Sequence, residues 1–267
     1  MGHFLVIGGT GVMGTAAIQA AREHFGPDAV IVANWYGKEI PDFKIEGANQ
    51  TLFGDITDPA CREQIKSING GKYDYLFYAT ALGEVGIPIK DATPEQIAKS
   101  NQLSFDPIPQ LEEELDIGTS VGYSTFYTIR HQLCTYGAMG HSKEAIEKWA
   151  LTEGPSRHAC IRAGLFESPS SRGIKLLLRK TAKNPENLKD PLLRSYFENT
   201  PSSQGIKRFE EGIFAEEKEL YGDCRTRQED LYQAHLELFK NENPVFINVC
   251  GKRIWTSEEP LLLKDHY

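Results

Sequence analysis

The chain has 267 residues, of which 40% are hydrophobic and 25% are charged, enough apolar material for a substantial globular core. Its formal net charge of −8 argues against general nucleic-acid binding, because a phosphate backbone needs a basic surface. No apolar run approaches the roughly 20 residues that span a bilayer, and the apolar residues 4–7 lead into glycines rather than a signal-peptide cleavage region. We therefore expect a cytoplasmic protein with neither a nucleic-acid nor a membrane partner.

The five cysteines are odd in number, lie far apart and form no Cys-x-x-Cys pair. Such spacing indicates neither a disulfide framework nor a zinc cluster. We expect reduced, structural thiols and no metal site.

Short β-rich apolar runs alternate along the chain with longer segments of helical character. This alternation predicts an α/β fold, a doubly wound parallel sheet of the Rossmann type in a single domain, because parallel strands need helical crossovers. Asp58 followed by Pro59 marks the clearest helix start, since aspartate caps free backbone N–H groups and proline lacks the N–H that would be orphaned. Strands are expected at residues 4–7, 30–33, 51–53, 75–79, 115–120, 159–162 and 245–249.

Residues 169–230 differ from the rest in their weak periodicity and their charge. The part from 172 to 208 has nine basic and three acidic residues, whereas the part from 210 to 230 has eight acidic and three basic residues. One interpretation is a pair of solvated amphipathic helices whose charges attract each other. The other is a helical lid over the substrate, whose basic part receives an anionic group.

The strongest motif is a glycine-rich turn placed directly after the strand at 4–7 and before a helix expected over 15–25. Glycine spaced as G-x-x-G-x-x-G allows a tight turn, a close approach of the backbone to a pyrophosphate, and close packing of helix on strand. The helix N-terminus then offers free N–H groups to the anion. The segment predicted to bind a dinucleotide is Gly8, Gly9, Thr10, Gly11, Val12, Met13 and Gly14.

The end of the second strand usually distinguishes NAD from NADP, because an acid there binds ribose hydroxyls and a base pairs with a 2′-phosphate. Residues 32–38 contain no acid. Asn34 and Lys38 are suited to a phosphate, so NADP(H) is preferred and NAD(H) remains the alternative; a surface lysine can equally be only a solvated charge.

Over its first two thirds the chain resembles the short-chain dehydrogenase/reductase family. The resemblance rests on the glycine turn and on further matches after the third and fourth strands and in the following helix. It implies that Asp55 and Ile56 contact adenine, that Ala79 lies in a small-residue turn beside the cofactor, and that Asn101 assists a proton relay. After about Ser168 the match is loose and no site residue is carried over.

Tyr136 and Lys143 are the predicted catalytic pair. Most members of the family have Tyr-x-x-x-Lys, but Met139 occupies the tyrosine position here and cannot transfer a proton. Tyr136 lies seven residues before Lys143, and seven residues at about 100° each make nearly two helical turns, so both side chains can share one face. This Tyr-x6-Lys spacing resembles the enoyl-acyl carrier protein reductase branch, as does the second aromatic, Tyr127.

The chemistry expected of this pair follows from hydride transfer, which leaves an oxygen that must be stabilised and protonated. Tyr136 would supply the proton, while Lys143 would hold the nicotinamide ribose and lower the tyrosine pKa. Tyr127 would orient the substrate, and Ser124, with Ser120 as its rival, would polarise a carbonyl. Alternatively, Tyr136 is a packed aromatic and Lys143 a solvated helix lysine.

The sequence thus predicts an NAD(P)H-dependent oxidoreductase that transfers hydride to a polarised C=C or C=O bond of a small molecule, an enoyl thioester or a ketone. The family resemblance implies a homodimer or homotetramer. The alternative is a non-catalytic NAD(P)-binding sensor, for which Met139 is the best argument.

Overall fold

A computed structural model describes residues 2–241 and 244–266. Its centre is an eight-stranded sheet with the order β3-β2-β1-β4-β5-β6-β7-β8, in which all neighbouring pairs are parallel except β7 and β8. The chain thus forms the predicted doubly wound α/β fold. The strands are β1 (His3–Ile7), β2 (Val30–Trp35), β3 (Gln50–Phe53), β4 (Lys72–Tyr78), β5 (Asp116–Thr125), β6 (Arg157–Ala163), β7 (Phe246–Cys250) and β8 (Arg253–Ser257).

All seven predicted strands are confirmed, with β5 running five residues further than expected. The eighth strand was not predicted. Cys250 pairs with Arg253, so β7 and β8 form a hairpin whose two-residue turn begins at Gly251 with a φ of 55°. A positive φ suits glycine, and such a turn matches the twist of the two strands.

Helices connect the parallel strands and cover both faces of the sheet. Asp58 accepts a hydrogen bond from the Ala60 N–H at the predicted start of the second helix, which confirms that helix. The helices are α1 (Val12–Phe25), α2 (Pro59–Ser67), α3 (Pro94–Ser104), α4 (Pro107–Glu114), α5 (Arg130–Leu133), α6 (Gly137–Trp149), α7 (Pro169–Thr181), α8 (Pro191–Ser195), α9 (Ser202–Tyr221) and α10 (Gln228–Lys240), with short 3-10 turns at Ile68–Gly71, Ile89–Asp91 (η2), Pro185–Asn187 and Leu263–Asp265 (η4).

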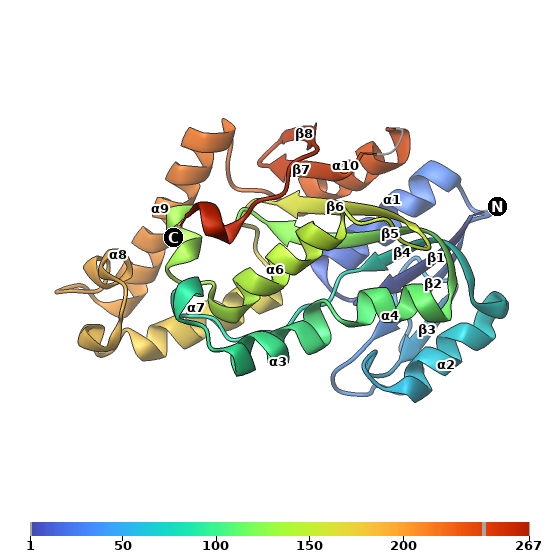
Figure 1. The fold of residues 1–267 in the computed structure, drawn as a ribbon, viewed down its shortest axis with the longest axis horizontal. Helices are drawn as coiled ribbons and strands as arrows, with labels where there is room; N and C mark the ends of the chain where they lie inside the picture. The colour runs from blue at the N-terminus through green and yellow to red at the C-terminus, as the bar shows by residue number, and fades with distance from the viewer. Residues whose placement is uncertain (1, 242–243, 267) are drawn as a thin grey trace.

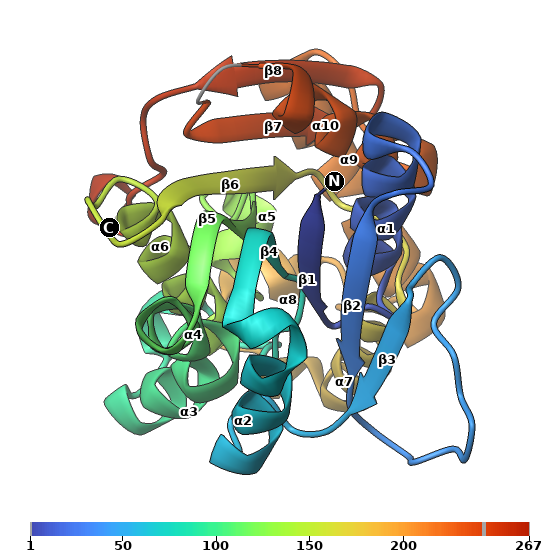
Figure 2. The same ribbon diagram turned by 90° about the vertical axis from the view of Figure 1, so that its right-hand side faces the viewer.

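Two hydrophobic cores lie on opposite faces of the sheet. In β1, Phe4 and Val6 pack into the core under α1 and α10, whereas Leu5 and Ile7 pack into the core under α2, α4 and α6. Because successive side chains of a strand point to opposite faces, a strand buried on both sides must be apolar throughout. Figure 2 shows α1 and α10 on one side of the sheet and α2, α4 and α6 on the other.

Residues 169–221 lie beyond the carboxyl ends of the parallel strands, where Figure 1 shows α8 and α9 at the left of the molecule. They are not merely solvated helices. Buried side chains from α8 and α9 join Phe126 and Ile129 in a third hydrophobic core. The predicted attraction between the basic and acidic halves takes the form of a 2.5 Å ion pair between Lys175 and Glu210.

Candidate active site

The glycine turn after β1 is shaped by backbone contacts that leave no room for side chains. Gly8 and Gly9 donate their N–H groups to the Asn34 carbonyl at 3.1 and 2.9 Å, which ties the turn to β2. Gly8 has a φ of 80°, and a Cβ there would lie 2.8 Å from the Ala79 carbonyl oxygen. A Cβ on Gly14 would lie 2.3 Å from the Gly8 carbonyl oxygen. Both positions therefore require glycine.

The same turn leads into a helix end that suits an anion. Gly11 is the N-cap of α1 and has no side chain to cap the free N–H groups, and the first turn of the helix carries no acid. Free N–H groups and the helix dipole together attract negative charge. Thr10 is exposed beside this helix end, and Val12 and Met13 begin the helix. These residues fit a dinucleotide pyrophosphate.

The two residues proposed for a 2′-phosphate occupy different environments. Asn34 is only 2% exposed, and its Nδ2 donates to the Gly54 carbonyl at 3.0 Å. Its side chain therefore joins β2 to the turn after β3 instead of facing solvent. Lys38 is exposed in the loop that follows β2, so its ammonium is accessible to solvent.

Asp55, Ile56 and Ala79 lie at the carboxyl ends of β3 and β4. The Asp55 carboxylate accepts hydrogen bonds from the N–H and hydroxyl of Thr57 at 2.9 and 2.8 Å, which orders the turn into α2. Ile56 is buried, whereas Ala79 is half-buried and its N–H bonds to the Ile7 carbonyl at 2.8 Å. All three thus lie at the edge of the sheet where the glycine turn is found. Ile56 contributes mainly to the hydrophobic core.

Tyr136 and Lys143 begin and continue helix α6. Tyr136 is the N-cap of the helix and is half-buried. Its pKa was expected to be lowered by Lys143, but burial raises it to about 12. Lys143 is 7% exposed, and its Nζ donates to the main-chain carbonyl of Tyr123 in β5 at 2.9 Å. Burial lowers the pKa of this ammonium to about 8, with Glu147 acting in the opposite direction. Lys143 is therefore a buried cation at the carboxyl end of β5, and Tyr136 is a protonated phenol at the start of the same helix.

Asn101 lies on α3 where this helix packs against α6. Its Oδ1 accepts a 2.7 Å hydrogen bond from Ser142, the residue before Lys143, and Ser142 also contacts the Ser100 hydroxyl at 2.7 Å. The three polar side chains join the two helices next to Lys143. The structure therefore brings Asn101 together with the segment that carries the predicted pair.

Ser124 is held by a buried carboxylate. It is 4% exposed, and its hydroxyl donates to Glu147 Oε1 at 2.5 Å. Glu147 also pairs with Arg162 at 2.7 Å, and both side chains are at most 5% exposed. The Ser120 hydroxyl contacts Ser156 at 2.9 Å instead. Both serine hydroxyls are thus engaged within the protein.

Tyr127 has no exposed surface, and its hydroxyl donates to the main-chain carbonyl of Leu261 near the C-terminus. Burial, with smaller contributions from Glu147 and Glu144, holds the pKa of this phenol far above its ordinary value. In this structure the ring packs with Ile89 and Leu263. Its hydroxyl is thereby committed to the C-terminal segment, not to a substrate.

A loop that the sequence analysis did not identify covers the start of α6. Gly86 donates to the Thr135 carbonyl at 2.6 Å, and Gly137 and Ala138 donate to the carbonyls of Ile87 and Glu84, both at 3.0 Å. Gly137 has a φ of 49°, and a Cβ there would lie 2.4 Å from the Glu84 carbonyl oxygen. Gly137 was the feature of the sequence that could have indicated this loop, because glycine allows the two backbone segments to approach closely.

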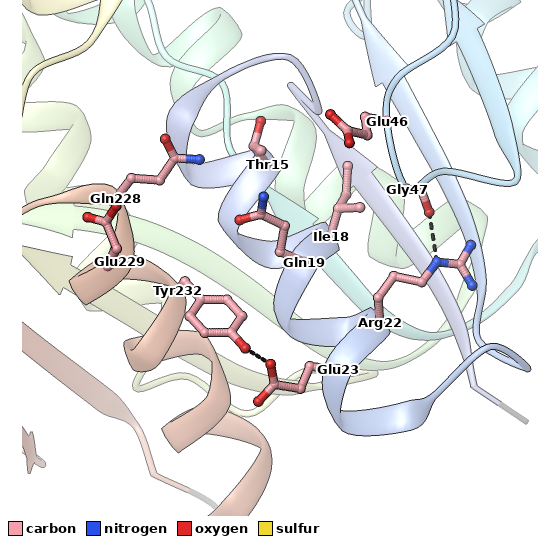
Figure 3. Close-up of a pocket in the computed structure, with 10 residues that line it drawn as sticks. All are labelled: Thr15, Ile18, Gln19, Arg22, Glu23, Glu46, Gly47, Gln228, Glu229 and Tyr232. Carbon is pink, nitrogen blue, oxygen red and sulfur yellow. Dashed lines mark hydrogen bonds between the residues drawn. The ribbon is translucent and has the colours of Figure 1, made fainter.

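A groove of about 600 Å³ lies elsewhere, between one side of α1, the loop before β3 and the start of α10 (Figure 3). Arg22 donates to the Gly47 carbonyl across it at 2.8 Å, and Tyr232 bonds to Glu23. The groove runs along the helix from Thr15, in its first turn, to Glu23 near its end.

Comparisons with known proteins find no matching family model and no matching curated relative. Solved structures do match. A short-chain dehydrogenase/reductase from Saccharomyces cerevisiae is 17% identical with a TM-score of 0.59, over 89% of this chain and 90% of that one. A 3-oxoacyl (acyl-carrier-protein) reductase from Agrobacterium tumefaciens with NADP bound is 14% identical with a TM-score of 0.59, over 88% and 86%. A small-chain dehydrogenase in complex with NADPH is 15% identical with a TM-score of 0.57, over 94% and 97%.

This likeness establishes the fold as that of the short-chain dehydrogenases. Among residues 2–241 and 244–266, no helix is long and apolar enough to cross a membrane.

Proposed function

We propose that the protein is an NAD(P)H-dependent reductase of a polarised C=O or C=C bond in a small molecule. The observation that carries the proposal is the buried Lys143, held against the carboxyl end of β5 seven residues after Tyr136. Ligands of open α/β sheets bind outside the carboxyl ends of the strands, and the glycine turn opens at that same edge. The solved structures of this fold that hold NADP or NADPH support the same cofactor class.

The cofactor would be held by the glycine turn and the N-terminus of α1, with Lys38 beside its adenosine end and Lys143 beside its nicotinamide ribose. Once bound, the cofactor supplies hydride to the substrate. The Lys38 environment favours NADP(H), and NAD(H) is the alternative. Calorimetric titration with each cofactor decides between them, and Lys38→Ala should weaken NADPH far more than NADH.

Tyr136 would hydrogen-bond the substrate oxygen and deliver the proton from its Oη. A phenol whose pKa is about 12 stays protonated at neutral pH, so it can donate. Lys143, whose pKa is about 8, remains mostly charged at pH 7 and stabilises negative charge on the phenol oxygen after the proton leaves. Asn101 would hold α6 through Ser142, while Ser124 would orient Glu147.

The substrate class that we favour is an enoyl thioester or a ketone. The basic residues between 172 and 208 would suit an anionic thioester carrier, and the Tyr-x6-Lys spacing favours the enoyl side. A homodimer or homotetramer is the expected assembly. Screening short enoyl thioesters and ketones for NADPH oxidation tests the substrate, and light scattering tests the assembly.

A non-catalytic NAD(P)-binding sensor is the second candidate, because Met139 replaces the tyrosine that most enzymes of the resembled family use. The Tyr136→Phe variant separates the two functions. In a reductase it should abolish turnover while cofactor affinity stays within about twofold; the Tyr232→Phe variant, remote from α6, is the control. Unchanged turnover in Tyr136→Phe would reject Tyr136 as the donor, and no turnover of any screened substrate by a parent that binds cofactor would favour the sensor.

A further inference from the structure

Residues 258–263, a segment near the C-terminus that we call the C-terminal strap, are held through main-chain hydrogen bonds. The Leu261 N–H donates to Glu147 Oε2 at 2.6 Å, and the Leu261 carbonyl accepts the Tyr127 hydroxyl. The Leu263 N–H donates to Glu144 Oε1 at 2.8 Å. Both main-chain polar groups of Leu261 are thus bonded to fully buried side chains.

Of the side chains that hold the strap, Tyr127 and Glu147 are fully enclosed by the protein interior. Glu147 is completely buried and already binds Ser124 and the Arg162 guanidinium. Arg162 in turn bonds to Asn248 of β7 at 2.7 Å. A buried carboxylate needs partners for its remaining lone pairs, and the Leu261 N–H supplies one. The strap therefore completes the ion-pair network between α6, β5, β6 and β7.

The strap also closes the packing around the proposed proton donor. Leu263 is 5% exposed and forms a small hydrophobic cluster with Ile89 and Tyr127, and Tyr136 and Leu261 pack against this cluster. In Figures 1 and 2 the C-terminal segment descends from β8 and ends beside the helices around α6. The strap thus touches the same cluster that supports the Tyr136 ring.

Glu144 and Glu147 follow Lys143 by one and four residues, so the strap is fastened to the turn of α6 that begins at the lysine. The strap therefore contacts two parts of the site. Its main-chain N–H groups bond to Glu147 and Glu144 on α6, and its Leu263 side chain lies in the hydrophobic cluster that Tyr136 packs against. A displacement of the strap would loosen both residues of the proposed pair without touching the glycine turn, which lies on β1 and α1.

We propose that the C-terminal strap positions Tyr136 and Lys143 for proton transfer, and that Tyr127, Glu147 and Leu263 are positioning residues that act through it. The expected effect on turnover rests on the proposed reductase function. The effect of the strap on the position of Tyr136 rests only on the contacts described above. It also assigns Tyr127 a role different from substrate orientation. Tyr127 would act by holding Leu261.

The Leu263→Ala variant tests the link, because it removes the strap's buried side chain and leaves every main-chain donor in place. Leu262→Ala is the matched control, since Leu262 is half-buried and outside the cluster. Hydrogen exchange followed by mass spectrometry reports both ends: the strap amides, and residues 132–139, where the Tyr136 N–H bonds to the Gln132 carbonyl at 2.8 Å. We expect faster exchange in both segments for Leu263→Ala and in neither for Leu262→Ala.

Turnover provides the second readout. Leu263→Ala and Tyr127→Phe should each lower kcat about tenfold, because small misplacement of a reacting group is costly, while the Kd for NADPH stays within about twofold of the parent. Their combined effect should be clearly less than the product of the two, since both act through one element. A KM effect without a kcat effect in Tyr127→Phe would instead indicate contact with the substrate.

The outcomes separate the two proposals. Faster exchange of the strap with unchanged exchange at 132–139 would overturn the positioning role, as would multiplicative effects of the two variants on kcat. Failure of the parent protein to bind NADPH or NADH would overturn the proposed function, and the exchange experiment would still decide whether the strap holds Tyr136.

Discussion

The buried Lys143 ammonium donates a hydrogen bond to the main-chain carbonyl of Tyr123, and this hydrogen bond joins helix α6 to the carboxyl end of β5. A buried ammonium loses hydration, which favours its neutral form. The hydrogen bond and the nearby Glu147 carboxylate favour the charged form. The result is a lysine whose pKa is about 8, close enough to neutral pH for its charge to change under ordinary conditions.

Turnover should therefore fall as the pH rises through about 8. Below this value Lys143 carries the positive charge that the proposed proton donor requires, and above it the charge is lost. We expect kcat/KM for the reductase reaction to decrease up to tenfold per pH unit on this alkaline limb. Lys143→Met should abolish turnover at every pH. An alkaline limb near 10.5 would show that burial does not perturb this lysine.

Glu217 gives a pH dependence of stability. It is 1% exposed, accepts the Leu165 N–H at 2.6 Å, and among the described residues its Oε2 has no hydrogen-bond partner. Burial raises its pKa from 4.5 to about 7, so the folded protein binds a proton that the unfolded chain releases. This contribution to the free energy of unfolding is full below about pH 4.5 and is lost as the pH rises to about 7.

The Glu217→Gln variant should be more stable than the parent at pH 8, by about 2 to 3 kcal/mol, because glutamine resembles the protonated acid. The difference should disappear near pH 4.5. Urea unfolding at both pH values measures it, and the exposed Glu219→Gln on the same helix is the control. Equal stability at pH 8 would mean that Glu217 is ionised there at no cost.

The middle and the last glycine of the G-x-x-G-x-x-G motif should differ in their tolerance of a methyl group. Gly14→Ala places a Cβ 2.3 Å from the Gly8 carbonyl oxygen, where only backbone movement can relieve the clash, at a cost of about 2 kcal/mol or more. Gly11→Ala places its Cβ 3.3 Å from the same oxygen at a φ of −78°, which a side chain tolerates. Thermal unfolding of the two variants should rank Gly14→Ala well below Gly11→Ala, and a reversed order would contradict this turn geometry.

The buried ion pair between Glu147 and Arg162 should depend on both partners. Arg162→Met leaves a carboxylate without its counter-charge in the interior and should destabilise the protein by about 3 to 5 kcal/mol. Arg225→Met removes an exposed partner of Glu211, a pair of similar length at 2.6 Å compared with 2.7 Å, and should cost far less stability. Chemical unfolding of the two variants gives the comparison. Similar losses would show that burial does not decide the strength of these pairs.

The fold was predictable because its signals are local. From Phe4 to Ile7 β1 is apolar at every position, as a strand buried on both faces must be; Asp58 and Pro59 mark a helix start within two residues. β8 was missed because Arg253 and Thr256 are exposed on an edge strand, and such a strand carries no apolar run. The Gly251 turn was its only local sign.

The candidate site was predictable only in part, because its remaining features depend on contacts between distant residues. The hydroxyl of Tyr127 meets a carbonyl 134 residues further along the chain, and the partner of Ser124 is a carboxylate on another element. Spacing in sequence contains neither relationship. It did place Tyr136 and Lys143 on one helix, because that spacing is local.

Calorimetric titration of the purified protein with NADPH and then NADH, repeated on Gly11→Asp, tests the central claim most directly. Aspartate at the N-cap supports the helix but places a negative charge where the pyrophosphate would bind. We expect one cofactor to bind the parent in the micromolar range or tighter, and Gly11→Asp to lose at least tenfold in affinity while remaining folded. Absence of binding to the parent, or equal binding to both proteins, would contradict a dinucleotide site at this turn.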